Sequence, residues 1–390
     1  MGLMWVNVGV SGVQKEPTPT ARPKYSTKGG YSAKSFAKLG LPASIVVPLM
    51  QAANHSLAAN TWTSYATAER HIARVEKATG VRLTFPFSLK STLAYVGYLL
   101  SPKSEGGRGL QGKSVEKYLS ALRSIHMLKG HFDAWLRPEI VKEITKGAAT
   151  RDQLNKRLQG KTGKHAMTPE IMWELKQRLS KSNITKSKRR IIWAVSTICW
   201  AGAFRIHELL ARAAGSYCRM TTMTAGDITV EKATLNGVKV DILKVHLKHP
   251  KEERLSAGVT IDCFPSGDFM CPVTAFLNWK KDKVCKLSTQ KPLFRLANGE
   301  NYTGTNFNRD LKSLLKEVVD YEVAPITSHS FRRGLATFMR KQGCYSDEEI
   351  MRIGRWHSRA FEAYIIAPRE VRARLAAELA TRVAQAVQLS

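Results

Sequence analysis

The stretch HSFRRGLATFMRKQGCYSDEEIMRIGRWHSRAFEAYI, residues 329–365, holds most of the pattern that decides the fold of this chain. Apolar residues recur in it at three- and four-residue spacing, and a capping box, Ser346–Glu349, separates two predicted helices. His329 and Arg332 lie one helical turn apart and therefore share a face. Together they can hold an anion and move a proton, and Tyr364, on a separate short segment, can reach the same anion. A lone His-x-x-Arg is also a frequent accident, so its meaning depends on the sequence upstream.

A second arginine, Arg205, lies upstream at the end of an apolar run. Residues 191–204 form an apolar run that predicts a buried helix, too short to span a bilayer, and Arg205 follows it directly. An arginine in such a place is costly to bury without a partner. Arg205 therefore points either to an acid, for which Glu208 is the nearest candidate, or to a bound phosphate.

These features together resemble the tyrosine recombinase (phage integrase) family. The resemblance rests on AGAFRIHELL at residues 201–210, the His329–Arg332 pair, GRWHS at residues 354–358, and the tyrosine that follows this turn. The sequence of residues 329–365 most resembles the DIRS-like and Crypton recombinases of eukaryotic mobile elements. The resemblance covers roughly residues 41–364. It implies a site-specific recombinase, or integrase, that breaks and rejoins DNA strands in the integration, excision or transposition of a mobile element.

The resemblance also implies a role for each matching residue. Tyr364 is expected as the nucleophile that forms a 3′-phosphotyrosyl intermediate, and Arg205 and Arg332 as the phosphate ligands. His329 is expected to transfer protons, while Glu208 supports the site without reacting. No metal or other cofactor is needed for this chemistry, and the sequence contains no carboxylate cluster that would hold a metal.

Elementary chemistry supports these roles alongside the resemblance. Breaking a phosphodiester without losing its energy requires a covalent intermediate, and a phosphotyrosyl ester is about as energetic as the bond that is broken. The attack builds negative charge on the non-bridging oxygens, and the forks of two arginines bind such oxygens bidentately. A histidine suits the proton transfer because its pKa lies near the working pH.

The departing 5′-oxygen needs a proton, and the family carries a lysine on a β-hairpin for this step. Residues 227–264 alternate as antiparallel strands do, with Asn236-Gly237 as the predicted hairpin turn. Lys251, in the loop before the last strand, fits the family pattern best, and Lys248 is the alternative. A lone lysine on a hairpin more often only guards a sheet edge.

One further catalytic position is ambiguous. The family commonly places a His or Trp 9 positions before the nucleophile. Here Trp356 lies 8 positions before Tyr364 (364 − 356), and His357 lies 7 positions before it (364 − 357). Either residue would hydrogen-bond the phosphate or pack behind the tyrosine, and neither has the family spacing.

The predicted fold is mainly α with a small antiparallel β-sheet. Residues 41–146 are expected to form a four-helix, SAM-like core-binding domain, and residues 165–368 an α+β catalytic domain, which in the family form a C-shaped clamp on DNA. Residues 1–40 are expected to be a flexible basic segment, and residues 147–164 a basic linker. A C-terminal helix over residues 369–390 can pack on its own core or dock on a neighbouring protomer, and the resemblance favours docking.

The composition favours a nucleic-acid partner. The chain has 390 residues, 43% of them hydrophobic, and its 61 Lys and Arg against 31 Asp and Glu give a net charge of +30. Such an excess along a folded chain points to a polyanion, with nucleic acid as the first candidate and an anionic membrane as the second. The six cysteines include no C-x-x-C pair, which favours a reducing compartment and no zinc site.

The expected partners are double-stranded DNA recombination sites, bound by a homodimer on one site and by a homotetramer in synapsis, with no membrane. The expected compartment is the nucleus if the chain is eukaryotic, and the cytoplasm otherwise. Basic residues of the predicted helices and linker are the expected DNA contacts. They are Lys113, Lys117, Arg123, Arg151, Lys156, Arg157, Lys161, Lys164 and Arg333.

Two other functions are compatible with the pattern. A type IB topoisomerase uses nearly the same groups, but nicks and closes DNA as a single molecule. A recombinase-derived DNA-binding protein with a silent active site would keep the fold, and the shifted spacing of Trp356 is consistent with it. Assembly on DNA distinguishes the three: a tetramer on paired sites, a monomer, or binding without a covalent adduct.

Overall fold

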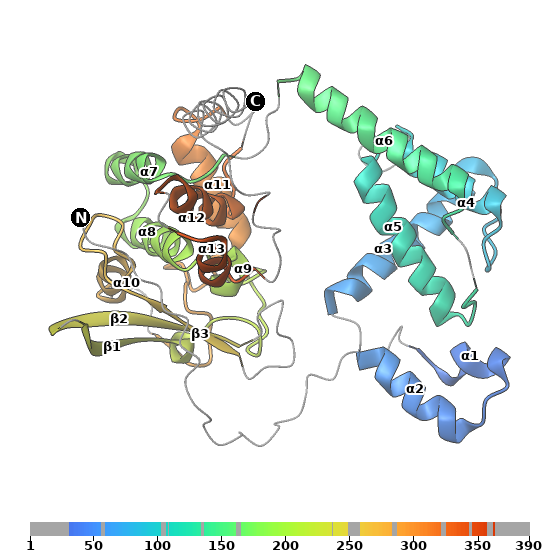
Figure 1. Ribbon diagram of the computed structural model, residues 1–390, viewed down its shortest axis with the longest axis horizontal. Coiled ribbons are helices and arrows are strands. Elements are labelled where there is room, and N and C mark those ends of the chain that lie inside the picture. The colour runs from blue at the N-terminus through green and yellow to red at the C-terminus, as the bar shows by residue number, and fades with distance from the viewer. Residues whose placement is uncertain are drawn as a thin grey trace, which may run out of the picture. The chain divides into compact units, whose positions relative to one another are not determined.

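The computed structural model divides the chain into two compact units, an N-terminal unit ending at Gly160 and a C-terminal unit beginning at Lys161 (Figure 1). The structure describes residues 31–55, 59–102, 107, 109–133, 136–160, 165–235, 237–248, 258–282, 287–320, 325–342, 345–356 and 362. The predictions for Lys161, Lys164, Lys251, His357 and Tyr364, and for the helix over residues 369–390, fall outside these residues.

The described part of the N-terminal unit is helical. Its elements are α1 (Ala33–Phe36), the 3-10 turn η1 (Ala37–Leu39), α2 (Ala43–His55), α3 (Ala59–Thr79), α4 (Leu89–Leu100), α5 (Gly112–Leu128) and α6 (Glu139–Leu158). Helix α5 packs against α3, α4 and α6, and their shared core includes the fully buried Tyr95, Leu119 and Leu122. The apolar residues spaced by three and four in the sequence are the ones that face this core, which is why these segments are helices.

Two boundaries of the N-terminal unit differ from the sequence prediction. Residues 147–158, predicted as linker, are the second half of α6, where the Asp152 carboxylate accepts a hydrogen bond from the Gly112 amide at 2.7 Å. Residues 31–40, predicted as part of a flexible segment, pack on the unit, with the Phe36 ring 5.6 Å from that of Phe132. Polarity alone predicted a loop in the first case, but tertiary contacts favour the helix.

The C-terminal unit combines helices with one sheet. Its elements are α7 (Pro169–Lys181), α8 (Lys186–Ala201), α9 (Ile206–Leu209), the 3-10 turn η2 (Ala225–Asp227), β1 (Ile228–Leu235), β2 (Val238–Leu247), β3 (Val259–Cys263), α10 (Pro272–Lys280), α11 (Gly304–Leu315), α12 (His329–Gln342) and α13 (Asp347–Gly354). The strands are antiparallel in the order β1-β2-β3, and Val245 pairs with Ile228 on one side and Ile261 on the other. The predicted fold class, mainly α with a small antiparallel sheet, is confirmed.

Helix α8 is the centre of this unit. From residue 191 to residue 201 every side chain except Trp193 is buried, and α7, α10 and α12 contact the helix (Figure 1). Among the described helices none is long and apolar enough to cross a membrane. Because α8 is buried, its last turn lies in the interior of the unit, and Arg205 follows just beyond it.

Candidate active site

Arg332 is the most buried charged residue of the candidate site. It lies on α12 and is only 1% exposed. Its Nη1 donates to the Ala203 carbonyl at 2.6 Å, and its Nη2 donates to the Gly354 carbonyl at 2.7 Å. The Trp356 ring covers the guanidinium, with 4.9 Å between its centroid and Cζ. Arg332 therefore joins the end of α8 to the end of α13, and the cation–π contact stabilises its charge.

Arg205 and Glu208 form a pair at the start of α9. One carboxylate oxygen of Glu208 accepts from the Arg205 backbone amide at 2.8 Å, and the other lies 3.1 Å from Arg205 Nη1. Burial by itself raises the pKa of Glu208, but the charge of Arg355 and the bonds and charge of Arg205 outweigh it, so the pKa of the carboxyl is lowered. Glu208 is therefore ionised, as its predicted supporting role requires.

Arg355 is a third arginine of this cluster, and the sequence analysis missed it. Its Nη2 lies 3.1 Å from a Glu208 carboxylate oxygen and 3.2 Å from the Ala203 carbonyl oxygen, and its guanidinium lies 4.9 Å from the Phe204 ring centroid. One signal would have found it. Arg355, unlike Trp356, lies 9 positions before Tyr364 (364 − 355), the spacing at which the resemblance leads one to expect a His or Trp.

The turn that presents Arg355 has an unusual backbone. Arg355 caps α13 with φ +54°, in the left-handed region that glycine usually occupies. Gly354 precedes it because a Cβ there would lie 1.7 Å from the Trp356 ring. Ala203, whose carbonyl is shared by two arginines, also has a positive φ of 47°. Strained residues that persist in a structure cluster at functional sites, and here they orient the groups around the three guanidiniums.

The three arginines of this cluster share two acceptors. Arg205 and Arg355 both bond to the Glu208 carboxylate, and Arg332 and Arg355 both lie within hydrogen-bond distance of the Ala203 carbonyl. The Arg355 and Glu208 side chains are only 12% and 11% exposed. Charges in so buried a site are poorly screened by water, so the cluster suits an anion.

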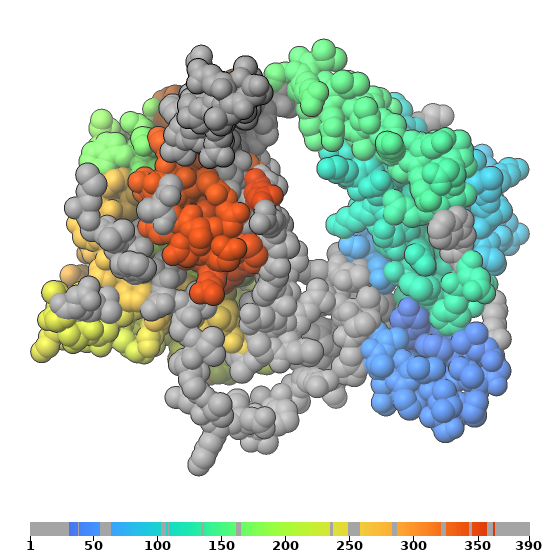
Figure 2. Space-filling model, in the orientation of Figure 1, coloured from blue at the N-terminus to red at the C-terminus, as the bar shows by residue number. Residues whose placement is uncertain are grey.

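His329 lies at the edge of the same region. It is exposed, as the first residue of α12, and neighbouring bonds fix the start of this helix. The Ser328 amide donates to the Asn308 side chain at 2.9 Å, and the Thr327 amide donates to Ser330 Oγ at 3.0 Å. The N-terminus of a helix favours anions, so His329 and the helix end both suit a phosphate. In Figure 2 the orange-red atoms of α12 and α13 lie together on the face turned toward the viewer.

Lys248, the alternative hairpin lysine, has a structural role. Its Nζ lies 2.7 Å from an Asp227 carboxylate oxygen and donates to the Arg219 carbonyl at 2.8 Å. These bonds join the residue after β2 to the turn before β1. Because its ammonium is held by an acid, Lys248 is poorly suited to donate a proton to DNA, and Lys251 remains the predicted general acid.

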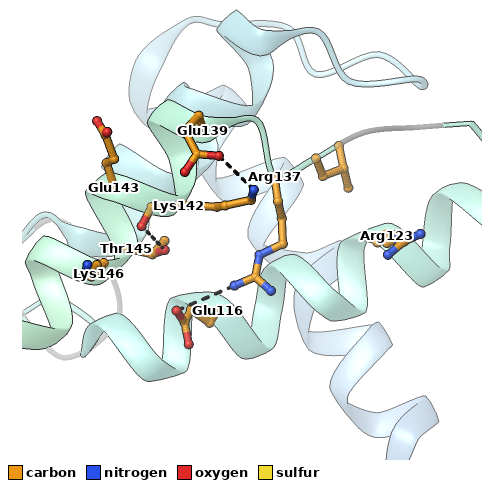
Figure 3. Close-up of a pocket in the computed structure, with 9 residues that line it drawn as sticks. Glu116, Arg123, Arg137, Glu139, Lys142, Glu143, Thr145 and Lys146 are labelled. Carbon is orange, nitrogen blue, oxygen red and sulfur yellow. Dashed lines mark hydrogen bonds and ion pairs between the residues drawn. The ribbon is translucent and has the colours of Figure 1, made fainter.

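The predicted DNA contacts of the N-terminal unit lie on exposed surface. They are Lys113, Lys117 and Arg123 on α5, and Arg151, Lys156 and Arg157 on α6. Arg123 also lines a hollow of about 710 Å³ beside α6, where the nearby charges are mixed (Figure 3). There Arg137 pairs with Glu116 at 3.6 Å and Lys142 with Glu139 at 2.9 Å. In the C-terminal unit Arg333 is half-buried. Among the described residues no three His, Cys, Asp or Glu side chains gather as a metal site requires.

The fold has counterparts among solved structures. The XerH site-specific recombinase bound to palindromic difH substrate, a post-cleavage complex, matches with a TM-score of 0.52 and 13% identity, over 90% of this chain and 90% of that chain. The pre-cleavage complex of XerH with difH gives 0.50 and 14%, over 88% of each chain. The Tn1549 transposon integrase in complex with a circular intermediate DNA gives 0.48 and 16%, over 80% of this chain and 91% of that chain. Neither a protein-family model nor a curated protein matches the sequence. The two XerH matches therefore show that the chain has the tyrosine recombinase fold.

Proposed function

We propose that this chain is a tyrosine site-specific recombinase that cleaves and rejoins double-stranded DNA through a covalent 3′-phosphotyrosyl intermediate on Tyr364. The observation that carries the proposal is the arginine cluster. Arg205 and Arg355 bond to one carboxylate, and Arg332 and Arg355 share the Ala203 carbonyl, although Arg205 and Arg355 are 150 residues apart along the chain (355 − 205). A phosphodiester is an anion that such a cluster suits, and charge develops on its oxygens during attack.

The proposed reaction conserves the energy of the phosphodiester. The phenol oxygen of Tyr364 attacks phosphorus, the bond from phosphorus to the 5′-oxygen breaks, and a phosphotyrosyl bond forms. The phenol proton passes to His329, and Lys251 protonates the departing 5′-oxygen. Attack by a 5′-hydroxyl of another strand then reverses these steps and releases the tyrosine.

The arginines act on the phosphate that is transferred. Arg205 and Arg332 bind its non-bridging oxygens, and each contact contributes a few kcal/mol, about 2.7–4 for one donor of an oxyanion hole, to transition-state stability. Trp356 packs on Arg332 and limits its rotation, which is a supporting role for one of the two residues predicted at the fifth position. His357 remains a prediction.

The biological setting is also a proposal. The sequence of residues 329–365 supports a recombinase of a mobile element, of the DIRS-like or Crypton kind, that acts in a nucleus. The net charge of +30 supports a DNA partner. On its DNA the chain is expected to form a dimer on one site and a tetramer when two sites meet.

Covalent trapping tests the proposed function. Wild type, Tyr364→Phe and Tyr217→Phe are each incubated with a DNA library that contains the flanks of the gene, quenched with detergent, and assayed for protein-linked DNA. Tyr217 is a matched control because it is an exposed tyrosine of the same unit, 43% exposed. An adduct is expected from wild type and Tyr217→Phe, and none from Tyr364→Phe.

The same assay separates the alternatives. Salt-sensitive DNA binding without an adduct from any protein would support a silent DNA-binding protein. An adduct formed by a monomer that relaxes supercoiled DNA without exchanging strands would support a topoisomerase. Sequencing the trapped ends gives the DNA site for the strand-exchange assay.

A further inference from the structure

Arg355 contacts the same acceptor groups that hold Arg205 and Arg332 in place. Its Nη2 lies 3.1 Å from the Glu208 carboxylate, which also holds the backbone and side chain of Arg205. The same Nη2 lies 3.2 Å from the Ala203 carbonyl, which also accepts from Arg332 Nη1. A movement of Arg355 therefore changes the acceptors available to both neighbouring guanidiniums.

The local backbone is built to hold Arg355 in this place. A left-handed conformation is unfavourable for a residue with a side chain, and Arg355 adopts it with φ +54°. The helix could end more cheaply with glycine, so the contacts of the side chain have to offset that cost. They are the ion pair with Glu208 and the stacking over Phe204 at 4.9 Å.

The guanidinium of Arg355 has further binding capacity. Its Nε and Nη1 are buried and have no hydrogen-bond partner among the described residues. Its Nη2 alone makes the bonds to Glu208 and Ala203. Its charge is delocalised over three nitrogens, which a lysine at this position would not reproduce.

We infer that Arg355 is a positioning residue for DNA cleavage, because it fixes the position of Arg205 through Glu208 and that of Arg332 through the Ala203 carbonyl. The charge of Arg355 also makes the cluster a binding site for a phosphate anion. This inference rests on the proposed function for the cleavage step. The anion site itself does not depend on Tyr364.

The cleavage arm uses Arg355→Ala and Arg355→Lys, with Arg352→Ala as the matched control, since Arg352 is an exposed arginine on the same helix. Single-turnover cleavage and DNA affinity are measured separately on the trapped DNA site. For Arg355→Ala we expect cleavage to slow by about 10²-fold, as for loss of a preorganised oxyanion donor. DNA affinity should change by no more than about threefold, because one contact among many is altered. Added guanidinium ion should restore part of the rate of Arg355→Ala, and an equal concentration of ammonium ion should not.

The anion arm does not need cleavage. The unfolding temperature is measured with and without inorganic phosphate, and with an equal ionic strength of chloride. Phosphate should stabilise wild type and Arg352→Ala, and the shift should be lost in Arg355→Ala. Equal shifts in wild type and Arg355→Ala, or none in either, would overturn the inference, as would cleavage by Arg355→Ala at the wild-type rate.

The two arms separate failure of this inference from failure of the proposed function. A wild type that binds phosphate through Arg355 but forms no adduct keeps the anion site and removes the recombinase, together with the role of Arg355 in cleavage. A wild type that forms the Tyr364 adduct while Arg355→Ala cleaves normally keeps the recombinase and removes the positioning role. Loss of cleavage with a lowered unfolding temperature, no guanidinium rescue and an unchanged phosphate shift would assign Arg355 a merely structural role.

Discussion

Replacing Gly334 by alanine should destabilise the C-terminal unit, although alanine is the better helix former. Gly334 lies in α12, and a Cβ at this position would be 2.0 Å from the Met167 carbonyl oxygen and 2.7 Å from its carbon. Ordinary contact begins at 3.4 Å, so α12 and the Met167 backbone would have to separate by about 1.4 Å (3.4 − 2.0). The neighbour is backbone and cannot rotate away.

Two hydrogen bonds oppose this separation. The Met167 amide donates to the Ser330 carbonyl at 2.8 Å, and Trp200 Nε1 donates to the Met167 carbonyl at 2.9 Å. Weakening each costs about 1 kcal/mol, and overpacking costs about 1–3 kcal/mol. The helix propensity of alanine returns about 1 kcal/mol. The net loss is about 3 kcal/mol, or a fall of about 6–12 °C in the unfolding temperature of a unit of this size.

Thermal and urea unfolding of the full chain measure this effect. The matched control is Gly147→Ala in α6, where an added Cβ meets nothing within 4 Å, so this substitution should stabilise its unit by about 0.5–1 kcal/mol. Gly334→Ala should also slow DNA cleavage, since α12 carries His329 and Arg332. An unfolding temperature of Gly334→Ala at or above that of wild type would refute the packing argument.

Three further predictions concern single side chains. The pKa of His126 is lowered by burial, and its Nε2 accepts from the Phe87 amide at 2.9 Å, so the fold favours the neutral ring. The contribution of neutral His126 to the free energy of unfolding of the N-terminal unit should therefore be fully present above the unfolded pKa of about 6.5 and fall as the pH drops below it. Urea titrations at pH 7.5 and 5.5 measure this, and His126→Gln should show a smaller difference between the two pH values than wild type. An identical pH dependence in both proteins would contradict the prediction. Lys248→Met should lower the free energy of unfolding of the C-terminal unit by about 1 kcal/mol, because its ion pair is lost, and should slow cleavage far less than Lys251→Met. Single-turnover cleavage rates check this. A larger cleavage defect in Lys248→Met than in Lys251→Met would make Lys248 the general acid. Lys117→Ala should reduce the slope of log affinity against log salt by about 0.9, if Lys117 contacts one phosphate; an unchanged slope in DNA-binding titrations would place that lysine away from the DNA.

Local pattern was sufficient for most of the secondary structure. The apolar run from residue 191, predicted as a buried helix, forms most of α8, and the predicted capping box of Ser346 and Glu349 starts α13. Both signals are contained in a few neighbouring residues, because helix periodicity and capping depend on spacings of three and four. The pairing of Arg205 with Glu208 was likewise open to prediction, since the two residues are one turn apart.

Other features needed the tertiary structure. Polarity and glycine in residues 147–158 predicted a linker, but the helix continues because Asp152 bonds to Gly112, 40 residues away along the chain. Lys248 was a candidate acid until its contact with Asp227 showed an ion pair. Neither contact has a local signature, since each partner is ordinary in its own segment.

By itself the sequence determined the fold class, the order of the helices and strands, and the residue types from which a phosphate site could be made. The spacing of Arg355 from Tyr364 made it a candidate, but only the tertiary structure decided that it bonds to Glu208, and that Arg332 bonds to the Ala203 and Gly354 carbonyls. The physical reason is distance along the chain. Glu208 and Arg355 are 147 residues apart and meet only because α8, α12 and α13 pack around one core, which brings Arg355 to the carboxylate that Arg205 holds and to the carbonyl that Arg332 holds.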